Sequence, residues 1–311
     1  MANALKGRSI ASVRDVSGDE IEEILQLAST LKKETKQGRF RPILQNRVLV
    51  MVFQKPSSRT RVSFEVGIHQ LGGAAMYLSA QDIQIGRRET VADIARTLSR
   101  YCDCIVARVF DHKDILELIE YASVPVINAL SDLTHPCQAL SDLLTIREKK
   151  GDFRGLKLTY IGDGNNVAHS LLFACARMGC DISVAAPQGY QPREDIVKSA
   201  KEDAKKTGAK IEITSNPSAA VKDADIVYTD VWASMGQEAQ QEERKKIFKN
   251  FQVNSELLRG AKKDHTVMHC LPAHRGEEIT AEVIDGPNSI VFDQAENRLH
   301  VQKAIMALII K

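Results

Sequence analysis

The sequence predicts an α/β protein of two domains, each a parallel β-sheet flanked by helices. Its 311 residues are about twice the usual length of a single domain. Short runs rich in β-branched residues alternate with longer stretches of helical period, and this alternation occurs twice. A polar, glycine-containing segment, Arg147–Gly155, separates the two series. Because strands that alternate with helices form parallel βαβ units, we expect two α/β domains that meet near residue 150.

The first series contains four predicted strands. A helical pattern at Asp19–Lys36 precedes them, and another at Asp111–Tyr121 separates the last two. The four strands are Arg47–Phe53, Ala75–Leu78, Cys104–Arg108 and Pro125–Ile127.

The second series contains six predicted strands and is followed by a helical pattern at Gln294–Ile310. The apolar end of that helix should pack onto a domain, although its own residues do not indicate which one. The six strands are Leu156–Ile161, Ile182–Ala185, Lys210–Ile213, Ile226–Tyr228, Thr266–Met268 and Ile290–Phe292.

Charge and composition exclude several classes of protein. Lysine and arginine number 42 against 40 aspartates and glutamates, and this net charge of +2 does not favour nucleic-acid binding. No apolar stretch approaches the roughly 18 to 20 residues of a membrane span, and the N-terminal residues do not resemble a signal peptide. We therefore expect a soluble, cytoplasmic protein. The six cysteines are irregularly spaced, so they predict small buried side chains rather than a disulfide framework.

The segment Ser57–Arg61 is the first candidate binding motif. It lies where a strand ends and a helical pattern begins, so helix N–H groups, hydroxyls and two arginines come together. A serine-capped helix with a solvated basic first turn is the alternative. Arginines in a first turn oppose the helix dipole, and a bound anion such as phosphate explains them better.

Three further elements follow strands of the first series: Arg108, the loop Ser79–Glu89 with Gln84, and His135–Gln138. Ligands of open parallel sheets bind beyond the carboxyl ends of the strands, so these residues should meet Ser57–Arg61 in one crevice. Pro136 fits the first turn of a helix, which would place His135 at its cap. An ordinary capping role remains the alternative for this histidine.

The second series carries polar motifs in the same positions. Gly162–Asn166 superficially resembles a dinucleotide fingerprint, but Val167 replaces its third glycine and no ribose-binding acid follows, which disfavours NAD. Two asparagines there suit a small polar ligand instead. Asp230–Gly236 and His269–Gly276 also follow predicted strands.

Cysteine and histidine chemistry is possible at the last of these motifs. His269, Cys270 and His274 could be metal ligands, but no carboxylate motif completes a zinc set. Cys270 as a covalent nucleophile would need a base, for which the two histidines are candidates. Neither possibility is favoured.

Taken together, the motifs are similar to those of the ornithine carbamoyltransferases, in the same order and over nearly the whole chain. The motifs are Ser57–Arg61, His135–Gln138, Gly162–Asn166, Asp230–Gly236, His269–Pro272 and Glu296–Arg298. Ser58 departs from the family, which usually has threonine there. The resemblance implies a carbamoyl-phosphate domain of residues 1–150, joined by the C-terminal helix 294–311. It also implies an ornithine domain of residues 151–293, with the active site in the interdomain cleft.

The same resemblance implies a role for each matching residue. For carbamoyl phosphate, Gln84 is expected to reach the site of a neighbouring subunit, and Arg59, Arg108, His135 and Cys270 are the catalytic candidates. The expected carbamoyl-phosphate ligands are Ser57, Ser58, Arg59, Thr60, Gln84, Arg108, His135, Gln138, Cys270, Leu271 and Arg298; those of ornithine are Asn166, Asp230, Ser234 and Met235.

The implied reaction is carbamoyl transfer from carbamoyl phosphate to the δ-amine of L-ornithine, which gives citrulline and phosphate. No cofactor and no metal are expected, and the assembly is expected to be a homotrimer or a multiple of trimers. Aspartate carbamoyltransferases differ, because they have His-Pro-Leu-Pro where this chain has His269–Pro272. Acetylornithine or putrescine as the acceptor, and a silent amino-acid-binding paralogue, remain alternatives.

Overall fold

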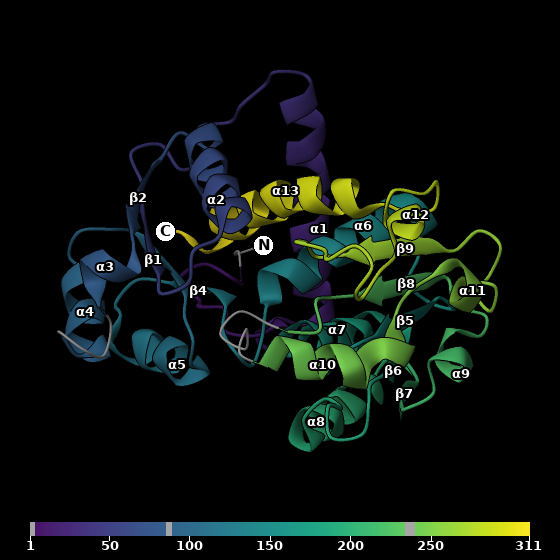
Figure 1. Ribbon diagram of the computed structural model, residues 1–311. Coiled ribbons are helices and arrows are strands. Elements are labelled where there is room, and N and C mark those ends of the chain that lie inside the picture. The colour runs from purple at the N-terminus through teal and green to yellow at the C-terminus, as the bar shows by residue number, and fades with distance from the viewer. Residues whose placement is uncertain (1–3, 85–88, 234–239) are drawn as a thin grey trace. The chain divides into compact units, whose positions relative to one another are not determined.

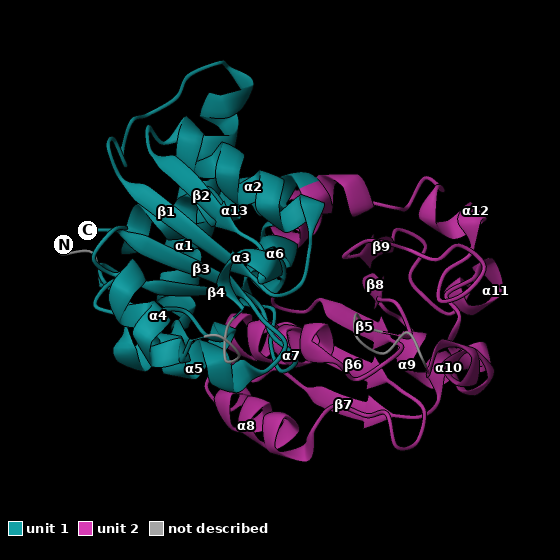
Figure 2. Ribbon diagram, turned by 60° about the vertical axis from the view of Figure 1, so that its left-hand side comes forward, with its two compact units in different colours: residues 1–144, 296–311 teal, residues 145–295 magenta. Residues whose placement is uncertain are grey.

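The computed structural model describes residues 4–84, 89–233 and 240–311. The chain divides into two compact units, which Figure 2 distinguishes by colour. Unit 1 consists of residues 1–144 and 296–311, and unit 2 of residues 145–295. The C-terminal segment therefore belongs to the same unit as the first half of the chain.

Unit 1 is built on a parallel sheet with the strand order β2-β1-β3-β4. The inner strands β1 and β3 are buried along almost their whole length, as expected for a parallel sheet covered on both faces. The strands are β1 (Val48–Phe53), β2 (Ala74–Leu78), β3 (Cys104–Arg108) and β4 (Val126–Leu130).

Helices cover both faces of this sheet. The long helix α13 packs beside α1 and α2, where the Lys303 ammonium donates to Thr35 and Gln70, both at 2.8 Å (Figure 1). On the other face, apolar residues of α4 and α5 such as Ile94 and Ile115 join the sheet in one core. The helices are η1 (Val13–Asp15), α1 (Gly18–Lys36), α2 (Ser58–Gln70), α3 (Ala80–Ile83), α4 (Val91–Leu98), α5 (His112–Tyr121), α6 (Pro136–Lys150) and α13 (Val291–Ile309); α6 and α13 continue across the unit boundary.

Unit 2 contains a second parallel sheet, with the strand order β7-β6-β5-β8-β9. Its strands are β5 (Lys157–Ile161), β6 (Asp181–Ala185), β7 (Ile211–Thr214), β8 (Ile226–Thr229) and β9 (Thr266–His269). Its helices are α7 (Asn166–Met178), α8 (Glu194–Ala204), α9 (Pro217–Val221), α10 (Gln241–Phe248), η3 (Lys249–Phe251), α11 (Ser255–Leu258) and α12 (Ala281–Ile284).

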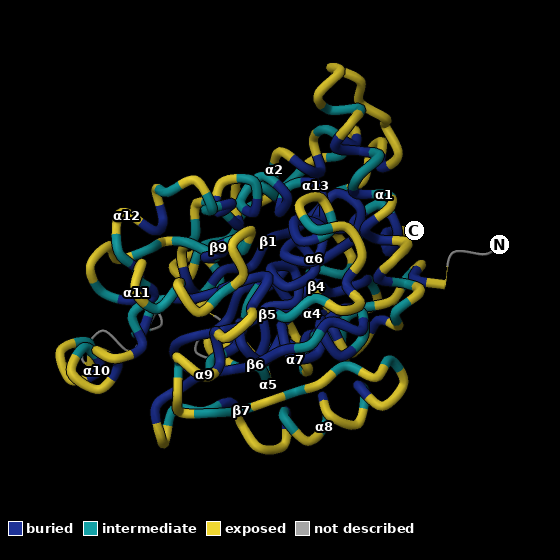
Figure 3. Tube along the Cα trace, turned by 90° about the vertical axis from the view of Figure 1, so that its right-hand side faces the viewer, coloured by how far each residue is buried: buried dark blue, intermediate teal, exposed yellow. Residues whose placement is uncertain are grey.

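Strand alternation places different side chains on the two faces of the unit 2 sheet. Ile161, Val227 and Val267 contribute to one apolar core, together with residues of α9 to α12. Tyr160 and Tyr228 are register partners on the other face, and their rings stack with centroids 5.8 Å apart. Figure 3 shows the central strands β5 and β6 and the helix α7 as largely buried, whereas the edge strand β7 and the outer helix α8 carry exposed residues.

One predicted strand is wrong. Ile290–Phe292 does not form a strand, because α13 already begins at Val291. The chain just before it makes a single parallel bridge, in which the Val267 N–H donates to Asn288 and the Ile290 N–H donates to Val267. The chain therefore makes one bridge at the edge of the sheet, and the β-branched residues that follow already belong to the start of α13. The other predicted strands are confirmed within three residues at either end.

Among the described residues, no helix combines the length and the apolar character that a membrane span requires.

Candidate active site

In each sheet, predicted motifs follow the two central strands between which the order of the strands along the chain reverses. In unit 1 the order changes between β1 and β3, and Ser57–Arg61 and Arg108 lie at the carboxyl ends of these two strands. In unit 2 it changes between β5 and β8, which Asp163 and Asp230 follow. Open α/β sheets bind ligands at such switch points, so each unit carries one candidate half-site.

The first turn of α2 forms the base of the unit 1 half-site. Ser57 is the N-cap, and its hydroxyl accepts a hydrogen bond from the Thr60 N–H at 3.3 Å. Thr60 is fully buried, and its hydroxyl receives a hydrogen bond from Arg298 of α13 at 3.0 Å. The exposed Ser58 and half-buried Arg59 complete the turn. Two positions 238 residues apart thus meet at a helix N-terminus, a favourable place for an anion.

The second arginine of the motif does not belong to this half-site. The Arg61 Nε donates to Glu65 at 3.0 Å, and its guanidinium lies 4.0 Å from the ring centroid of Tyr77. The side chain is 47% exposed. Of the two positive charges expected at the anion site, the structure therefore places Arg61 on the outer face of α2.

Buried positive charge surrounds His135. Arg108 and Arg298 are 5% and 4% exposed, and both act electrostatically on this imidazole. Burial first, and then these two arginines, hold the pKa of His135 well below its usual range. A neutral His135 can donate one hydrogen bond without adding charge. The α6 helix begins at Pro136, as predicted, and the Gln138 amide donates to Asp142 at 2.8 Å.

Gln84, which the resemblance assigns to carbamoyl phosphate, has its described contact elsewhere. Gln84 is exposed at the end of α3, with φ 43°, and its amide donates to the Gln81 carbonyl at 3.4 Å. Ser234 and Met235 lie outside the described residues.

In unit 2, Asn165 joins two motifs. Its side-chain oxygen caps α7 by accepting from the Val167 and Ala168 N–H groups at 2.9 and 3.2 Å. Its amide donates to Asp230 at 2.8 Å. Asn166, the residue predicted for ornithine, is 9% exposed at the first position of α7.

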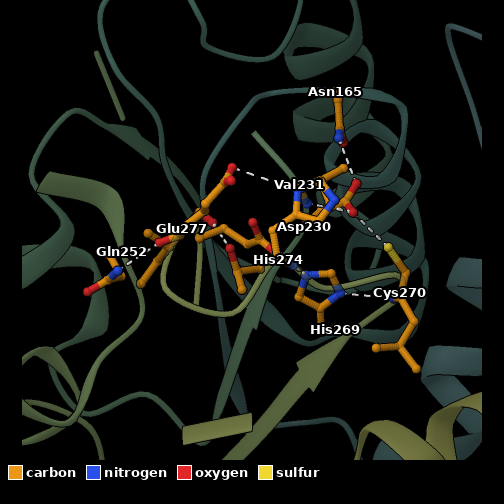
Figure 4. Close-up of polar contacts among 12 residues, drawn as sticks. Asn165, Asp230, Val231, Gln252, His269, Cys270, His274 and Glu277 are labelled. Atoms are coloured by element: carbon orange, nitrogen blue, oxygen red, sulfur yellow. Dashed lines mark hydrogen bonds and ion pairs between the residues drawn. The ribbon is translucent and has the colours of Figure 1, made fainter. Parts of the chain in front are cut away.

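Asp230 is the acceptor on which the unit 2 half-site converges (Figure 4). Besides Asn165, it accepts from the Cys270 thiol at 2.9 Å and from the Val231 N–H at 2.8 Å. Its side chain is buried, with 6% of the residue exposed. Neighbouring parallel strands end at Asp230 and Cys270, which explains why residues 40 positions apart are in contact.

Comparison with known proteins identifies the family. The model of the carbamoyl-phosphate-binding domain of the aspartate/ornithine carbamoyltransferases matches residues 8–148, and the model of their aspartate/ornithine-binding domain matches residues 154–309.

The chain belongs to the aspartate/ornithine carbamoyltransferase family.

Curated members of this family are similar over the full chain. The ornithine carbamoyltransferase of Thermococcus kodakarensis is 59% identical over 99% of this chain and 98% of its own. That of Bacillus subtilis is 53% identical over 99% and 95%. The solved ornithine carbamoyltransferase of Pyrococcus furiosus superposes with a TM-score of 0.96 at 57% identity, and covers 98% of both chains.

His269 is not placed to serve as the base of Cys270 in this family member. Its Nδ1 accepts from the Leu271 N–H at 2.9 Å, so its proton lies on Nε2, which donates to Glu278 at 3.1 Å. Both ring nitrogens are thus used, in a pair that is fully buried. His274 lies in a separate group with Glu277 and Glu278. These contacts disfavour His269 as the base that would activate the Cys270 thiol.

The same geometry bears on a metal site. Ligand atoms of Asp230, His269 and Cys270 lie within 4.8 Å of one another. A metal ion there would have to displace the Leu271 N–H from the His269 ring, or the proton that this ring shares with Glu278. The residues present therefore form a hydrogen-bonded cluster that does not offer a free imidazole ligand.

Sequence reasoning missed Arg244 and the partner role of Asp163. Arg244 is 6% exposed and donates to Asp163 at 2.8 Å, although in the sequence it belongs to a run of polar residues. The available signal was Phe248 four residues later, because positions i and i+4 share a helix face.

Proposed function

We propose that the protein transfers the carbamoyl group of carbamoyl phosphate to the δ-amine of L-ornithine, with L-citrulline and phosphate as products. Family membership supports carbamoyl transfer, and the full-length similarity to curated ornithine carbamoyltransferases supports ornithine as the acceptor. The observation that supports ornithine over acetylornithine is Asp230, a buried carboxylate at the unit 2 switch point. A carboxylate favours a charged ammonium, and acetylation removes that charge from the α-amino group.

Unit 1 is the proposed site of carbamoyl phosphate. The first turn of α2, with Ser57, Ser58, Arg59 and Thr60, would hold the phosphate through N–H groups, hydroxyls and one guanidinium. The buried cluster around His135 would hold the carbonyl end. The proposed members of that cluster are Arg108, His135, Gln138 and Arg298.

Unit 2 is the proposed site of ornithine. Asp230 would bind the α-ammonium, and Asn166 would bind the rest of the amino-acid head. Ser234 and Met235 are the further proposed ligands from the segment after β8. Cys270 and Leu271 would line the reacting centre, with the thiol held by Asp230. Direct attack by the amine needs no covalent intermediate on sulfur, and none is proposed.

The proposed chemistry forms a C–N bond and breaks the C–O bond to phosphate. The neutral δ-amine attacks the carbonyl carbon, a tetrahedral oxyanion forms, and phosphate leaves and takes up the proton that the amine loses. Arg59, Arg108 and His135 would stabilise the negative charge that develops on the oxyanion and the leaving phosphate. An alkyl amine of pKa about 10.4 requires roughly 4.6 kcal/mol to be neutral at pH 7. Exclusion of water around the bound amine would reduce that cost.

A homotrimer is the proposed assembly. Unit 1 exposes Val62 (54%) and Val66 (37%) of α2 and Met76 (57%) of the edge strand β2. Large apolar side chains on a sheet edge and a neighbouring helix favour contact with another chain. In such an assembly Gln84 would act in the site of a neighbouring subunit. Light scattering of the wild type and of Met76→Glu tests this, with a trimer mass expected only for the wild type.

The experiment that tests the function supplies carbamoyl phosphate with ornithine, acetylornithine, putrescine or aspartate in parallel. Carbamoylated product and released phosphate are both measured. Citrulline from ornithine alone is the expected result. Product from another amine would overturn the assignment of Asp230. No product from any amine, with carbamoyl phosphate still bound, would identify a silent paralogue.

A further inference from the structure

Arg244 is a buried guanidinium in α10, a helix whose other polar residues are exposed or half-buried. The structure describes all of α10, and its buried residues are Arg244 and Phe248. Placing a guanidinium in such a position is costly unless its charge and N–H groups are satisfied. A residue retained there therefore requires a structural or functional explanation.

The partners of Arg244 come from three separate segments of unit 2. Its Nη1 donates to Asp163 at 2.8 Å and to the Trp232 carbonyl at 2.7 Å, and its Nε donates to Gln240 at 3.3 Å. The guanidinium also lies 5.0 Å from the ring centroid of Tyr190. We name the contact of Arg244 with Asp163 and Trp232 the arginine clasp.

Both ends held by the clasp adjoin the half-site. Asp163 is two residues before Asn165, whose amide donates to Asp230. Trp232 is two residues after Asp230 and packs against Phe248 of α10, with ring centroids 6.0 Å apart. The clasp therefore connects the loop after β5 to the segment after β8. The Asn165–Asp230 hydrogen bond joins the same two segments, so its geometry depends on their relative position.

The ion pair is also strongly shielded from water. The side chains of Arg244 and Asp163 are 7% and 11% exposed. Burial raises the pKa of Asp163 to about 6, and the charge of Arg244 opposes that rise. Removal of the guanidinium would leave a buried carboxyl that favours the neutral form, and would release the Trp232 carbonyl.

We propose that Arg244 is a positioning residue for the amino-acid substrate. The arginine clasp holds Asn165 and Asp230 in the arrangement that binds the α-ammonium of ornithine. Arg244 itself does not touch the reacting atoms. This inference rests on the proposed function. Its signature is a loss of affinity for the amino acid with little change in affinity for carbamoyl phosphate.

Steady-state kinetics of Arg244→Gln and Asp163→Asn test the clasp. We expect the KM for ornithine to rise at least tenfold in each, the KM for carbamoyl phosphate to stay within twofold, and kcat to fall less than fivefold. The double variant should be little worse than either single variant, because both remove the same contact. Lys246→Gln is the matched control, since this exposed residue lies on the same helix; its constants should equal those of the wild type.

A second readout does not need turnover. Trp232 is the single tryptophan of the sequence, so its emission reports directly on one end of the clasp. Arg244→Gln and Asp163→Asn should shift that emission, and Lys246→Gln should not.

An ornithine KM within twofold of the wild type in folded Arg244→Gln would overturn the proposal, as would equal losses for both substrates. If the wild type produces no citrulline, the proposed function fails. The emission shift and calorimetric titration of amino acids then test the clasp separately. Unchanged emission and unchanged amino-acid affinity would reject it.

Discussion

The half-sites of the two units contain buried charges of opposite sign in different surroundings. In unit 1, Arg108 and Arg298 bring two positive charges to the same imidazole, His135. In unit 2, a single carboxylate, Asp230, is surrounded by donors from Asn165, Val231 and Cys270. Two neighbouring positive charges favour an anionic ligand, whereas a carboxylate with three donors is stabilised by the protein itself.

This difference indicates which half-site should be stabilised more by its ligand. The unit 1 half-site is suited to an anion, and binding of an anion should stabilise it most. The unit 2 half-site is preorganised by hydrogen bonds and by the arginine clasp.

Arg59→Ala should produce the largest loss. Without this guanidinium, the phosphate and its developing charge lose a donor, and the barrier should rise by about 3 to 4 kcal/mol, or a factor of roughly 150 to 900. The measurement is kcat and the KM for carbamoyl phosphate.

Arg61→Ala is the matched control in the same motif. Because Arg61 contacts Glu65 and Tyr77, its kinetics should remain within threefold of the wild type. Near-normal turnover of Arg59→Ala, or equal losses in the two variants, would contradict the division of the motif between an inner and an outer face.

Asp230→Asn tests the other half-site. Loss of the charge that pairs with the substrate ammonium should cost about 1.5 to 3 kcal/mol, or roughly a 10- to 150-fold higher KM for ornithine. The affinity for carbamoyl phosphate, measured by equilibrium binding to the variant, should be unchanged. A parallel loss of carbamoyl phosphate affinity would show that the halves are not separable as described.

Cys270→Ala should slow transfer without abolishing it, by roughly tenfold. The variant loses one hydrogen bond to Asp230 but no covalent intermediate, and such a bond is worth about 1.5 kcal/mol. Single-turnover rates measure the effect, and mass spectrometry of the wild type during turnover should find no carbamoyl group on Cys270. A carbamoylated thiol would overturn direct transfer.

His135 predicts a pH dependence of stability. Its pKa is lowered in the folded protein, so below its ordinary value of about 6.5 the unfolded chain binds one more proton than the folded one. Stability from this group is therefore complete above that pH and is lost as the pH falls, by up to about 1.4 kcal/mol per pH unit. Urea unfolding at pH 7.5, 6.5 and 5.5 measures the slope.

His135→Asn provides the comparison for that slope. The variant lacks the titrating ring, so its stability should fall less steeply below pH 6.5 than that of the wild type. Identical slopes in the two proteins would rule out His135 as the source.

Ser58→Thr should have the smallest effect. Ser58 is exposed at the first position of α2, so the added methyl group meets no packed neighbour there. Turnover and the melting temperature should match the wild type, within twofold and 2 °C. A larger change would place the methyl group in contact with the bound phosphate.

Much of the fold could be predicted from the sequence because its signals are local. The β-branched runs predicted ten strands, of which nine are confirmed, and the polar motifs after them lie at the strand ends as expected. Pro136 and Ser57 indicated the starts of α6 and α2 for reasons contained in a few residues. The strand predicted at Ile290–Phe292 failed because β propensity depends on available partners, and β9 offers only a single bridge there.

The sequence by itself determined the α/β class, the order of the motifs and the residue types that each half-site presents. Only the tertiary structure decided which of two neighbouring arginines lies inward, that His269 pairs with Glu278, and that Arg244 holds Asp163. The physical reason is sequence distance. A strand or cap depends on neighbours in the chain. The partner of a buried polar group depends instead on which segments packing brings together, and here those partners come from up to 268 residues away.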